Sequence, residues 1–310
     1  MIKKATLAIL IQMINPKYLY IETTNRCNAS CIMCPHPKMT RPKGTMSWEF
    51  FCLIIDQCKQ LDLCNLKLFL HKEGEPLLDS LLFKRIHHAR NELKKIKELS
   101  INTNGHLMSS NIAEKIVNSE LDKIYISIDG NSKYTYNKIR KFLDFDVVTS
   151  NVENLIKLKK ISGSKIKIII QMLVNDINKH EVFEFKSRWA DQADEIYIKA
   201  THSYLDGNLS IFKNNNTFEQ KHACFDPFNV IVVFWNGDCG VCCWDYDNLL
   251  KTDNTSKSTI LEIFNGKEFD KIRAAHLGKR CIDTIPCNRC LRIFGDDKIC
   301  DYEKLSNSMT

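Results

Sequence analysis

Between residues 17 and 200 the sequence repeats one rhythm, in which short runs rich in apolar and β-forming residues alternate with longer stretches of helical spacing. The clearest helical stretches cover residues 48–61, 80–94 and 148–160, and Ser47 is placed to cap the first of them. The expected strands cover residues 18–23, 66–70, 99–102, 123–128, 165–173 and 195–199. Such alternation predicts an α/β protein with a parallel sheet, either curved as a partial barrel or open and doubly wound.

The rhythm stops after about residue 205. Residues 206–217 are polar and rich in asparagine, as in a linker. An apolar strand over residues 228–235 then turns at Asn236 and Gly237, and two short helices are expected near residues 258–265 and 268–277. The expected organisation is a lead-in helix over residues 1–16, a core domain over 17–210 and a small β-hairpin and helix domain over 211–310.

Cysteine is the outlier of the composition, with 14 residues in a chain of 310. The cysteines fall into three groups, at 27–34, 52–64 and 224–300, with none from 65 to 223. This grouping favours metal ligation in a reducing compartment over a disulfide framework. The apolar run near the N-terminus is only about ten residues long, too short to span a bilayer, so we expect a cytoplasmic protein without membrane contact. The net charge of +7 is mild and does not predict nucleic-acid binding.

Cys27, Cys31 and Cys34 directly follow the first expected strand, at the edge where α/β folds place their chemistry. Thiolates are soft ligands that suit iron–sulfur clusters and zinc. Three thiolates on one loop can hold three irons of a 4Fe–4S cluster and leave the fourth iron open to a small molecule. A structural zinc site needs a fourth protein ligand, and His36 is close enough in sequence to provide it, so zinc is the alternative here.

The segment CNASCIMC over residues 27–34 resembles the signature of the radical S-adenosylmethionine (SAM) superfamily. Gly74, Glu75 and Pro76, after the second expected strand, are similar to that family's Gly-Gly-Glu motif, although Glu73 stands where the first glycine is usual. The resemblance implies that this segment meets the methionine amino group of SAM, which a carboxylate suits chemically. It also implies a partial (β/α)6 barrel over residues 17 to about 200.

Further residues at strand ends agree with the same resemblance. Asn104 follows the third expected strand, Ser127 and Asp129 lie at the end of the fourth, and Arg140 follows in the next helix. The resemblance implies that these side chains line the SAM pocket. Ser127 and Arg140 would hold the methionine carboxylate, which a guanidinium binds well, and Asp129 would lie near the ribose or the substrate.

The C-terminal cysteines resemble the truncated auxiliary-cluster module, called twitch, of SPASM-type radical SAM enzymes. The resemblance implies one auxiliary 4Fe–4S cluster on Cys224, Cys242, Cys287 and Cys290, which flank the expected hairpin and form a C-x2-C pair. A full SPASM module with two clusters continues C-x2-C-x5-C-x3-C, and this pattern is not met. The cysteines left unassigned keep a second auxiliary cluster open: Cys239, Cys243, Cys281 and Cys300. A four-thiolate zinc site is the other alternative.

For activity, the resemblance implies reduction of the first cluster by a flavodoxin or ferredoxin, cleavage of SAM to a 5′-deoxyadenosyl radical and hydrogen abstraction from the substrate. An auxiliary cluster that accepts one electron would make the net reaction an oxidation of an alcohol to a ketone. The layout is similar to that of dehydrogenases of aminocyclitols, so a sugar or aminocyclitol is the leading substrate class. Peptide modification is disfavoured because only 26 residues precede Cys27, too few for a peptide-recognition domain. Epimerisation and, as a non-enzyme, an iron–sulfur electron carrier also remain open.

Overall fold

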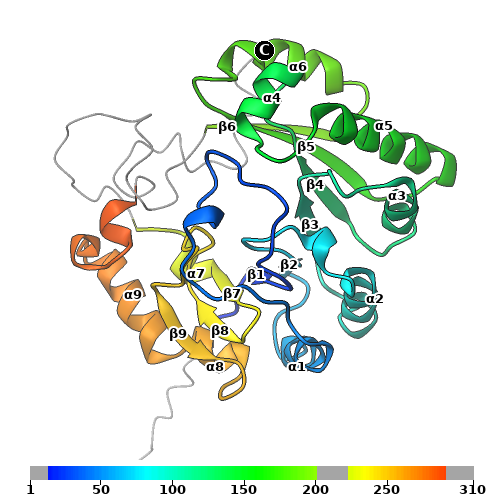
Figure 1. Ribbon diagram of the computed structural model, residues 1–310. Helices are drawn as coiled ribbons and strands as arrows, with labels where there is room; N and C mark the ends of the chain where they lie inside the picture. Colours follow the sequence, from blue (N-terminus) through cyan, green and yellow to red (C-terminus); the bar gives the residue numbers. More distant parts are fainter. Residues whose placement is uncertain (1–12, 201–222, 291–310) are drawn as a thin grey trace, which may run out of the picture.

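The computed structural model describes residues 13–200 and 223–290 and contains one nine-stranded sheet (Figure 1). The strand order is β6-β5-β4-β3-β2-β1-β7-β8-β9. Every neighbouring pair from β6 to β7 is parallel, whereas β8 and β9 are antiparallel additions. Because β6 and β9 end this order without pairing to each other, the sheet is not a closed barrel, and the expected α/β class with a partial barrel is confirmed.

The elements lie close to the expected ranges. The strands are β1 (Tyr18–Ile21), β2 (Lys67–Phe69), β3 (Glu98–Thr103), β4 (Lys123–Ser127), β5 (Lys167–Val174), β6 (Glu195–Ala200), β7 (Val230–Val233), β8 (Asp238–Gly240) and β9 (Lys251–Asn254). The helices are α1 (Trp48–Cys58), α2 (Leu82–Glu92), α3 (Ser110–Val117), α4 (Lys133–Ile139), α5 (Phe145–Ser162), α6 (Val182–Trp189), α7 (Asp226–Asn229), α8 (Ile260–Phe264) and α9 (Lys267–Leu277). The Ser47 side chain accepts a hydrogen bond from the Phe50 amide and caps α1, as predicted.

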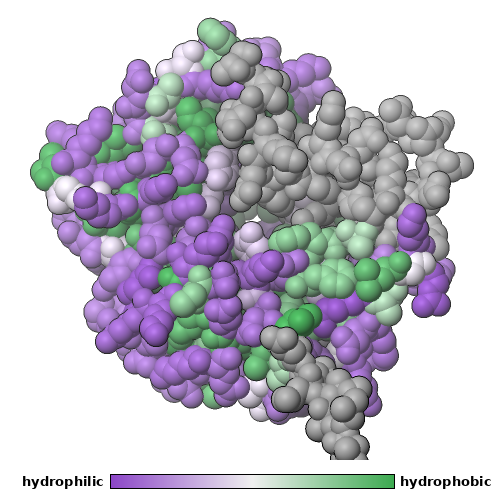
Figure 2. Space-filling view, turned by 180° about the vertical axis from the view of Figure 1, so that it is seen from behind, coloured by the Kyte–Doolittle hydropathy of each residue, from purple (hydrophilic) through white to green (hydrophobic). Residues whose placement is uncertain are grey.

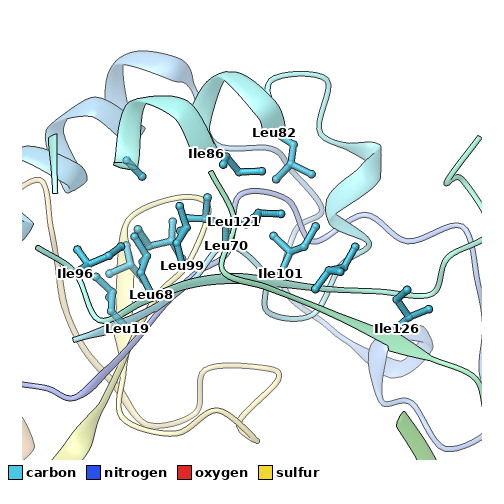
Figure 3. Close-up of a cluster of buried hydrophobic side chains, with 14 of the residues drawn as sticks. Leu19, Leu68, Leu70, Leu82, Ile86, Ile96, Leu99, Ile101, Leu121 and Ile126 are labelled. Atoms are coloured by element: carbon cyan, nitrogen blue, oxygen red, sulfur yellow. The ribbon is translucent and has the colours of Figure 1, made fainter. Parts of the chain in front are cut away.

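One face of the sheet forms the apolar core with the helices. Alternate strand residues point to this face, and Leu82 and Ile86 of α2 pack over them (Figure 3). The labelled residues of this cluster in or directly after the strands are Leu19, Leu68, Leu70, Leu99, Ile101 and Ile126. Burying each such side chain stabilises the fold by roughly 1.5–3 kcal/mol. A shift of strand register by one residue would expose these side chains, so packing against the helices favours the observed register. On the surface seen from behind, hydrophilic side chains predominate and apolar ones are exposed in smaller groups (Figure 2).

The other face of the sheet changes character along the strands. Near the middle it is aromatic, with the Tyr20 and Phe69 rings stacked at 4.6 Å between centroids. Toward the carboxyl ends of the strands this face becomes polar. There Gln171 donates a hydrogen bond to the Ser127 hydroxyl at 2.6 Å, and that hydroxyl donates one to Asn102 at 3.2 Å. Parallel α/β proteins build their sites at this edge.

The C-terminal segment joins the core sheet directly, which local sequence patterns did not predict. Strand β7 pairs in parallel with β1, with Tyr18 opposite Val230 and Ile21 opposite Val233. The expected hairpin turn then leads into β8, and Gly237 has φ +86°, a conformation that favours glycine. The hairpin domain therefore extends the barrel sheet at its β1 edge.

Four expectations concern residues outside the described ranges. The linker over residues 206–217 and the boundary near residue 210 lie there, as does Cys300. The lead-in helix over residues 1–16 lies there except for residues 13–16, which have no regular secondary structure. Within the described ranges, every helix is too short or too polar to cross a bilayer.

Candidate functional site

The loop that follows β1 carries the first cysteine group and is fixed to the end of α4. The Ile32 amide donates to the Ile139 carbonyl oxygen at 3.0 Å, and the Ser30 amide donates to the Lys141 carbonyl oxygen at 3.2 Å. This loop lies at the carboxyl edge of the parallel strands. Its backbone is therefore anchored by a neighbouring element of the fold.

Cys27, Cys31 and Cys34 lie close enough together to act on one another electrostatically. Burial raises the pKa of Cys27 to about 11 and that of Cys34 to about 12. Such thiols ionise when a metal binds, because its positive charge offsets the cost of burying a thiolate. This soft donor set fits three irons of a 4Fe–4S cluster. His36, the candidate fourth zinc ligand, has its Nε2 atom 2.8 Å from the Asn25 carbonyl oxygen, a contact that holds the loop itself.

The segment after β2 packs backbone to backbone against the cysteine loop. A Cβ atom on Gly74 would lie 2.4 Å from the Thr24 carbonyl oxygen and 2.8 Å from that of Arg26. The next residue, Glu75, donates its amide hydrogen to the Arg26 carbonyl oxygen at 2.8 Å. Pro76 then begins a short 3-10 helix, Pro76–Leu78. Glycine at position 74 is needed because no side chain fits between these two backbones.

The Glu75 carboxylate is buried and held in one orientation. Its Oε1 atom accepts hydrogen bonds from the Thr103 hydroxyl at 2.7 Å and the Leu77 amide at 3.1 Å, and its Oε2 atom accepts one from the Asn104 amide at 2.8 Å. Burial raises the pKa of Glu75, and these donors oppose the rise. The Asn104 side chain in turn donates to Asn28 in the cysteine loop at 2.8 Å. A carboxylate offers about four acceptor positions, so these bonds leave room for an ammonium group.

Arg140 connects the first cysteine group to Asp129. Its Nε and Nη2 atoms lie 2.7 and 2.6 Å from Asp129 Oδ2, and its Nη1 atom lies 3.7 Å from the Cys31 sulfur. Asp129 also accepts a hydrogen bond from the Leu173 amide at 2.7 Å. Burial alone would lower the pKa of Arg140, but Asp129 and Cys31 raise it above its ordinary value. The contact with Cys31 was not predicted from the sequence.

Ser127 belongs to a different network. Its hydroxyl contacts Asn102 and Gln171 on the neighbouring strands β3 and β5, whereas Arg140 contacts Asp129 and Cys31. The expected pairing of Ser127 with Arg140 on a single carboxylate would therefore need a ligand that spans both networks.

A second site lies in the C-terminal part of the chain. All four cysteines expected to hold an auxiliary cluster, Cys224, Cys242, Cys287 and Cys290, line one pocket, although they come from three separate segments. Burial raises the pKa of Cys242 well above its ordinary value and also raises that of Cys287. As at the first site, these buried thiols suit a soft metal cluster. In the described part of the chain no three His, Cys, Asp or Glu side chains are already arranged to hold a single metal ion.

The remaining C-terminal cysteines have different surroundings. Cys239 lies in β8 and is fully buried, with its sulfur 3.7 Å from the Gly237 carbonyl oxygen. Cys243 lies beside the pocket, with its sulfur 3.4 Å from the Asp226 carboxylate. Cys281 is buried next to the pocket and contacts the ring of His276 at 3.0 Å. His276 itself lines the pocket, and no sequence pattern singled it out.

A buried ion pair lies between the two sites. Lys72 and Glu73 follow β2, and their side chains are 2% and 6% exposed. Glu73 acts electrostatically on Cys34 of the first site, and Lys72 acts on Cys243 beside the second. Burial opposes the charge on Lys72, but Glu73 raises its pKa above the ordinary value. The sequence signal for this pair was Glu73 itself, which replaces the usual first glycine of the motif.

The segment after the cysteine loop fastens the two sites to each other. Arg41 makes a bidentate ion pair with Glu22 at 3.0 and 2.7 Å and donates to the Tyr246 carbonyl oxygen at 2.7 Å. The Thr40 amide donates to the Asp247 carboxylate at 2.8 Å. Bidentate arginine–carboxylate pairs restrict geometry strongly. The second site is therefore held against the carboxyl end of β1 by charged and backbone contacts.

Comparisons with known proteins agree with this arrangement. The family model of the radical SAM superfamily matches residues 21–186, and that of SPASM, an iron–sulfur cluster-binding domain, matches residues 224–291. A probable GTP 3′,8-cyclase of Methanocaldococcus jannaschii is 28% identical over 169 residues, which are 54% of each chain. The chain thus spans about half the length of that curated relative.

Two solved structures share the fold. BtrN in complex with AdoMet and 2-DOIA has a TM-score of 0.56 at 18% identity, covering 88% of this chain and 92% of BtrN. Streptococcus suis SuiB bound to the precursor peptide SuiA has a TM-score of 0.65 at 14% identity, covering 84% of this chain and 67% of SuiB.

A radical SAM domain uses a 4Fe–4S cluster and SAM, and a SPASM domain binds additional iron–sulfur clusters. The cysteines gathered at both sites provide the soft ligands that such clusters require. Because the first family model covers more than half of the 310 residues, the chain belongs to the radical SAM superfamily and carries a SPASM domain.

Proposed function

We propose that this protein is a dehydrogenase that oxidises an alcohol carbon of a sugar or aminocyclitol to a ketone. The observation that carries the proposal is the second pocket, in which four cysteines, three of them buried, lie on the far side of the Lys72–Glu73 ion pair from the first site. When bound, the first cluster and SAM provide a radical that removes a hydrogen atom from an unactivated carbon.

Different residues of the chain would bind the first cluster and SAM. Cys27, Cys31 and Cys34 would hold the first cluster, and the hydrogen bond from Arg140 to Cys31 would stabilise a thiolate. Glu75 would bind the methionine ammonium of SAM, because its carboxylate is already oriented by Thr103 and Asn104. Further members of the SAM pocket would be Gly74, Pro76, Asn104, Ser127 and Asp129.

The stoichiometry of the oxidation explains the need for a second site. Conversion of an alcohol carbon to a ketone releases one hydrogen atom, one proton and one electron. The electron needs an acceptor near the substrate, and Cys224, Cys242, Cys287 and Cys290 could hold one there. The substrate would lie between the sites, near Lys72 and Glu73, where charged side chains can bind hydroxyl and amino groups.

The likeness to BtrN supports a sugar or aminocyclitol as the substrate class. BtrN, crystallised with 2-DOIA, matches this chain over nearly the full length of both proteins. SuiB, crystallised with a precursor peptide, has a third of its length outside the match. Peptide modification or a redox-neutral reaction such as epimerisation or cyclisation is the second candidate, supported by the likeness to SuiB and the GTP cyclases.

We further propose that the core domain covers residues 17–210 and the cluster domain 211–310, a division supported by the separate family matches to residues 21–186 and 224–291. A flavodoxin or ferredoxin is the proposed reductant of the first cluster.

The cluster content is tested by iron and sulfide analysis with EPR on anaerobically reconstituted protein. About eight irons are expected in the wild type and about four in the triple variant Cys27→Ala/Cys31→Ala/Cys34→Ala, as two 4Fe–4S clusters require. SAM should perturb only the wild-type EPR spectrum. About four irons in the wild type and none in the triple variant would mean that the second site holds no cluster. The proposed oxidation would then lack its electron acceptor and would be wrong.

The reaction is tested with aminocyclitols deuterated at each alcohol carbon. Deuterium should appear in 5′-deoxyadenosine together with one equivalent of ketone. If hydrogen returned to the same carbon and no ketone formed, the dehydrogenase proposal would be wrong and the protein would be an epimerase.

A further inference from the structure

His276 lines the second cysteine site. It belongs to the last turn of α9, and its side chain is 2% exposed. The ring lines the same pocket as Cys224, Cys242, Cys287 and Cys290. A buried imidazole beside four cysteines is placed to act on whatever those cysteines bind.

The contacts of the ring determine which nitrogen carries the proton. The Cys224 backbone amide donates to Nδ1 at 3.3 Å. A backbone amide can only donate, so Nδ1 is an acceptor without a proton. In a neutral imidazole the proton then lies on Nε2. The Nε2 atom is 3.7 Å from the Cys287 sulfur, so His276 donates a hydrogen bond to that sulfur.

The same tautomer assigns different chemical states to two cysteines. Cys281 has its sulfur 3.0 Å from Nδ1, which is an acceptor, so Cys281 must contribute its own S–H hydrogen. Cys287 faces the N–H side of the ring and needs no proton to make its contact. Cys281 is therefore suited to remain a thiol, and Cys287 is suited to be a thiolate ligand.

We propose that His276 tunes the auxiliary iron–sulfur cluster through a hydrogen bond to the Cys287 sulfur, with Cys281 as a thiol that orients the ring and not as a ligand. The inference rests on the proposed function, because it requires that the second site hold a cluster. Reduction adds negative charge to a cluster and its sulfurs, and a hydrogen bond to a ligand sulfur favours that state. His276 thus raises the reduction potential of the acceptor, which makes the acceptor better able to take an electron from the substrate.

The potential is measured in the Cys27→Ala/Cys31→Ala/Cys34→Ala background, where only the second cluster contributes to the EPR signal. His276→Leu removes the donor and should shift the midpoint potential to a more negative value, with iron content still about four. His276→Gln retains an N–H donor and should restore most of the shift. The exposed His87→Leu is the matched control and should leave the potential unchanged.

An unchanged potential in His276→Leu with full iron content would overturn the hydrogen bond. Loss of iron in both His276 variants would also overturn it, because His276 would then be a ligand. If the triple variant without any His276 change holds no iron, the auxiliary cluster of the proposed function is itself absent, and the inference ends with it.

The two cysteines give an independent test. Cys287→Ser should reduce the iron content of the second site, whereas Cys281→Ser should leave it at about four. Loss of iron from Cys281→Ser with retention in Cys287→Ser would reverse the assignment and overturn the proposal.

Discussion

The two cysteine sites differ in how the chain builds them. The first takes three thiols from one stretch of eight residues, and the backbone of that stretch is hydrogen-bonded to the end of α4. The second takes four thiols from segments that lie between residues 224 and 290 and meet only after β7, the hairpin and α9 have packed. A local site tolerates distant changes, whereas an assembled site depends on every segment that contributes to it.

The largest expected effect is on the two steps of the reaction, SAM cleavage and ketone formation, which we assign to different sites. Cys31→Ala removes a thiol of the local site, so cleavage of SAM should fall to background. Cys242→Ala removes a thiol of the assembled site, so SAM cleavage should persist while ketone formation is lost. Both are measured by chromatography of 5′-deoxyadenosine and the product. If Cys242→Ala stopped SAM cleavage as completely as Cys31→Ala, the two sites would not act separately.

The next test uses the close packing under the local site. Gly74→Ala would place a Cβ atom 2.4 Å from the Thr24 carbonyl oxygen, so the cysteine loop must move. We expect a loss of about 1–3 kcal/mol in the free energy of unfolding, together with loss of iron from the first site only. Denaturant unfolding and iron analysis measure both effects.

The matched control for that test is Gly163→Asn at the end of α5. No atom lies within 4 Å of a Cβ there, and asparagine tolerates the φ of +65°. This variant should retain both stability and iron. Equal losses in the two glycine variants would mean that packing on the cysteine loop is not the cause.

A smaller effect is expected at Glu75. Glu75→Gln replaces a carboxylate that accepts three hydrogen bonds, and it removes the charge that would attract the SAM ammonium. Affinity for SAM should fall about tenfold, equivalent to about 1.4 kcal/mol, with the iron content of both sites unchanged. Equilibrium dialysis measures it, with the exposed Glu114→Gln as the control. Unchanged affinity would remove Glu75 from the SAM site.

The smallest effect is a pH dependence in the barrel interior beneath the first site. Burial lowers the pKa of His71 from 6.5 to about 3, and its Nδ1 atom accepts from the Asn102 amide. A depressed pKa means that its stabilising contribution is present above pH 6.5 and is lost as the pH falls. At about pH 6 the loss should be about 0.8 kcal/mol relative to about pH 8. His71→Asn, which keeps an acceptor, should lose less; an equal loss would assign the dependence to other groups.

Much of the first site could be predicted from sequence because its information is local. Two short stretches of sequence contain this information. One holds the spacing of Cys27, Cys31 and Cys34, and the other places Glu75 shortly after a strand. The strand expected over residues 123–128 became β4 (Lys123–Ser127), because burial on one face leaves a periodic apolar pattern. The four auxiliary cysteines were also predicted, but only from a family pattern.

The contacts that join the sites could not be predicted in this way. The pairing of β7 with β1 connects residues about 200 positions apart, and an apolar run does not indicate its partner strand. The ring of His276 reaches Cys287 because of how α9 packs against α7, and no spacing rule relates a helical histidine to a cysteine beyond that helix.

Local patterns in the chain were enough to predict the alternation of strands and helices, the superfamily and the candidate ligands of both clusters. Three features became visible only in the folded molecule: the SPASM domain extends the core sheet, Lys72 and Glu73 lie between the sites, and Cys287 rather than Cys281 faces the donor nitrogen of His276. Ligand spacing within a loop is set by covalent geometry, so it can be recognised in the sequence. Contacts between distant segments depend instead on strand order and helix packing, which short sequence patterns do not encode.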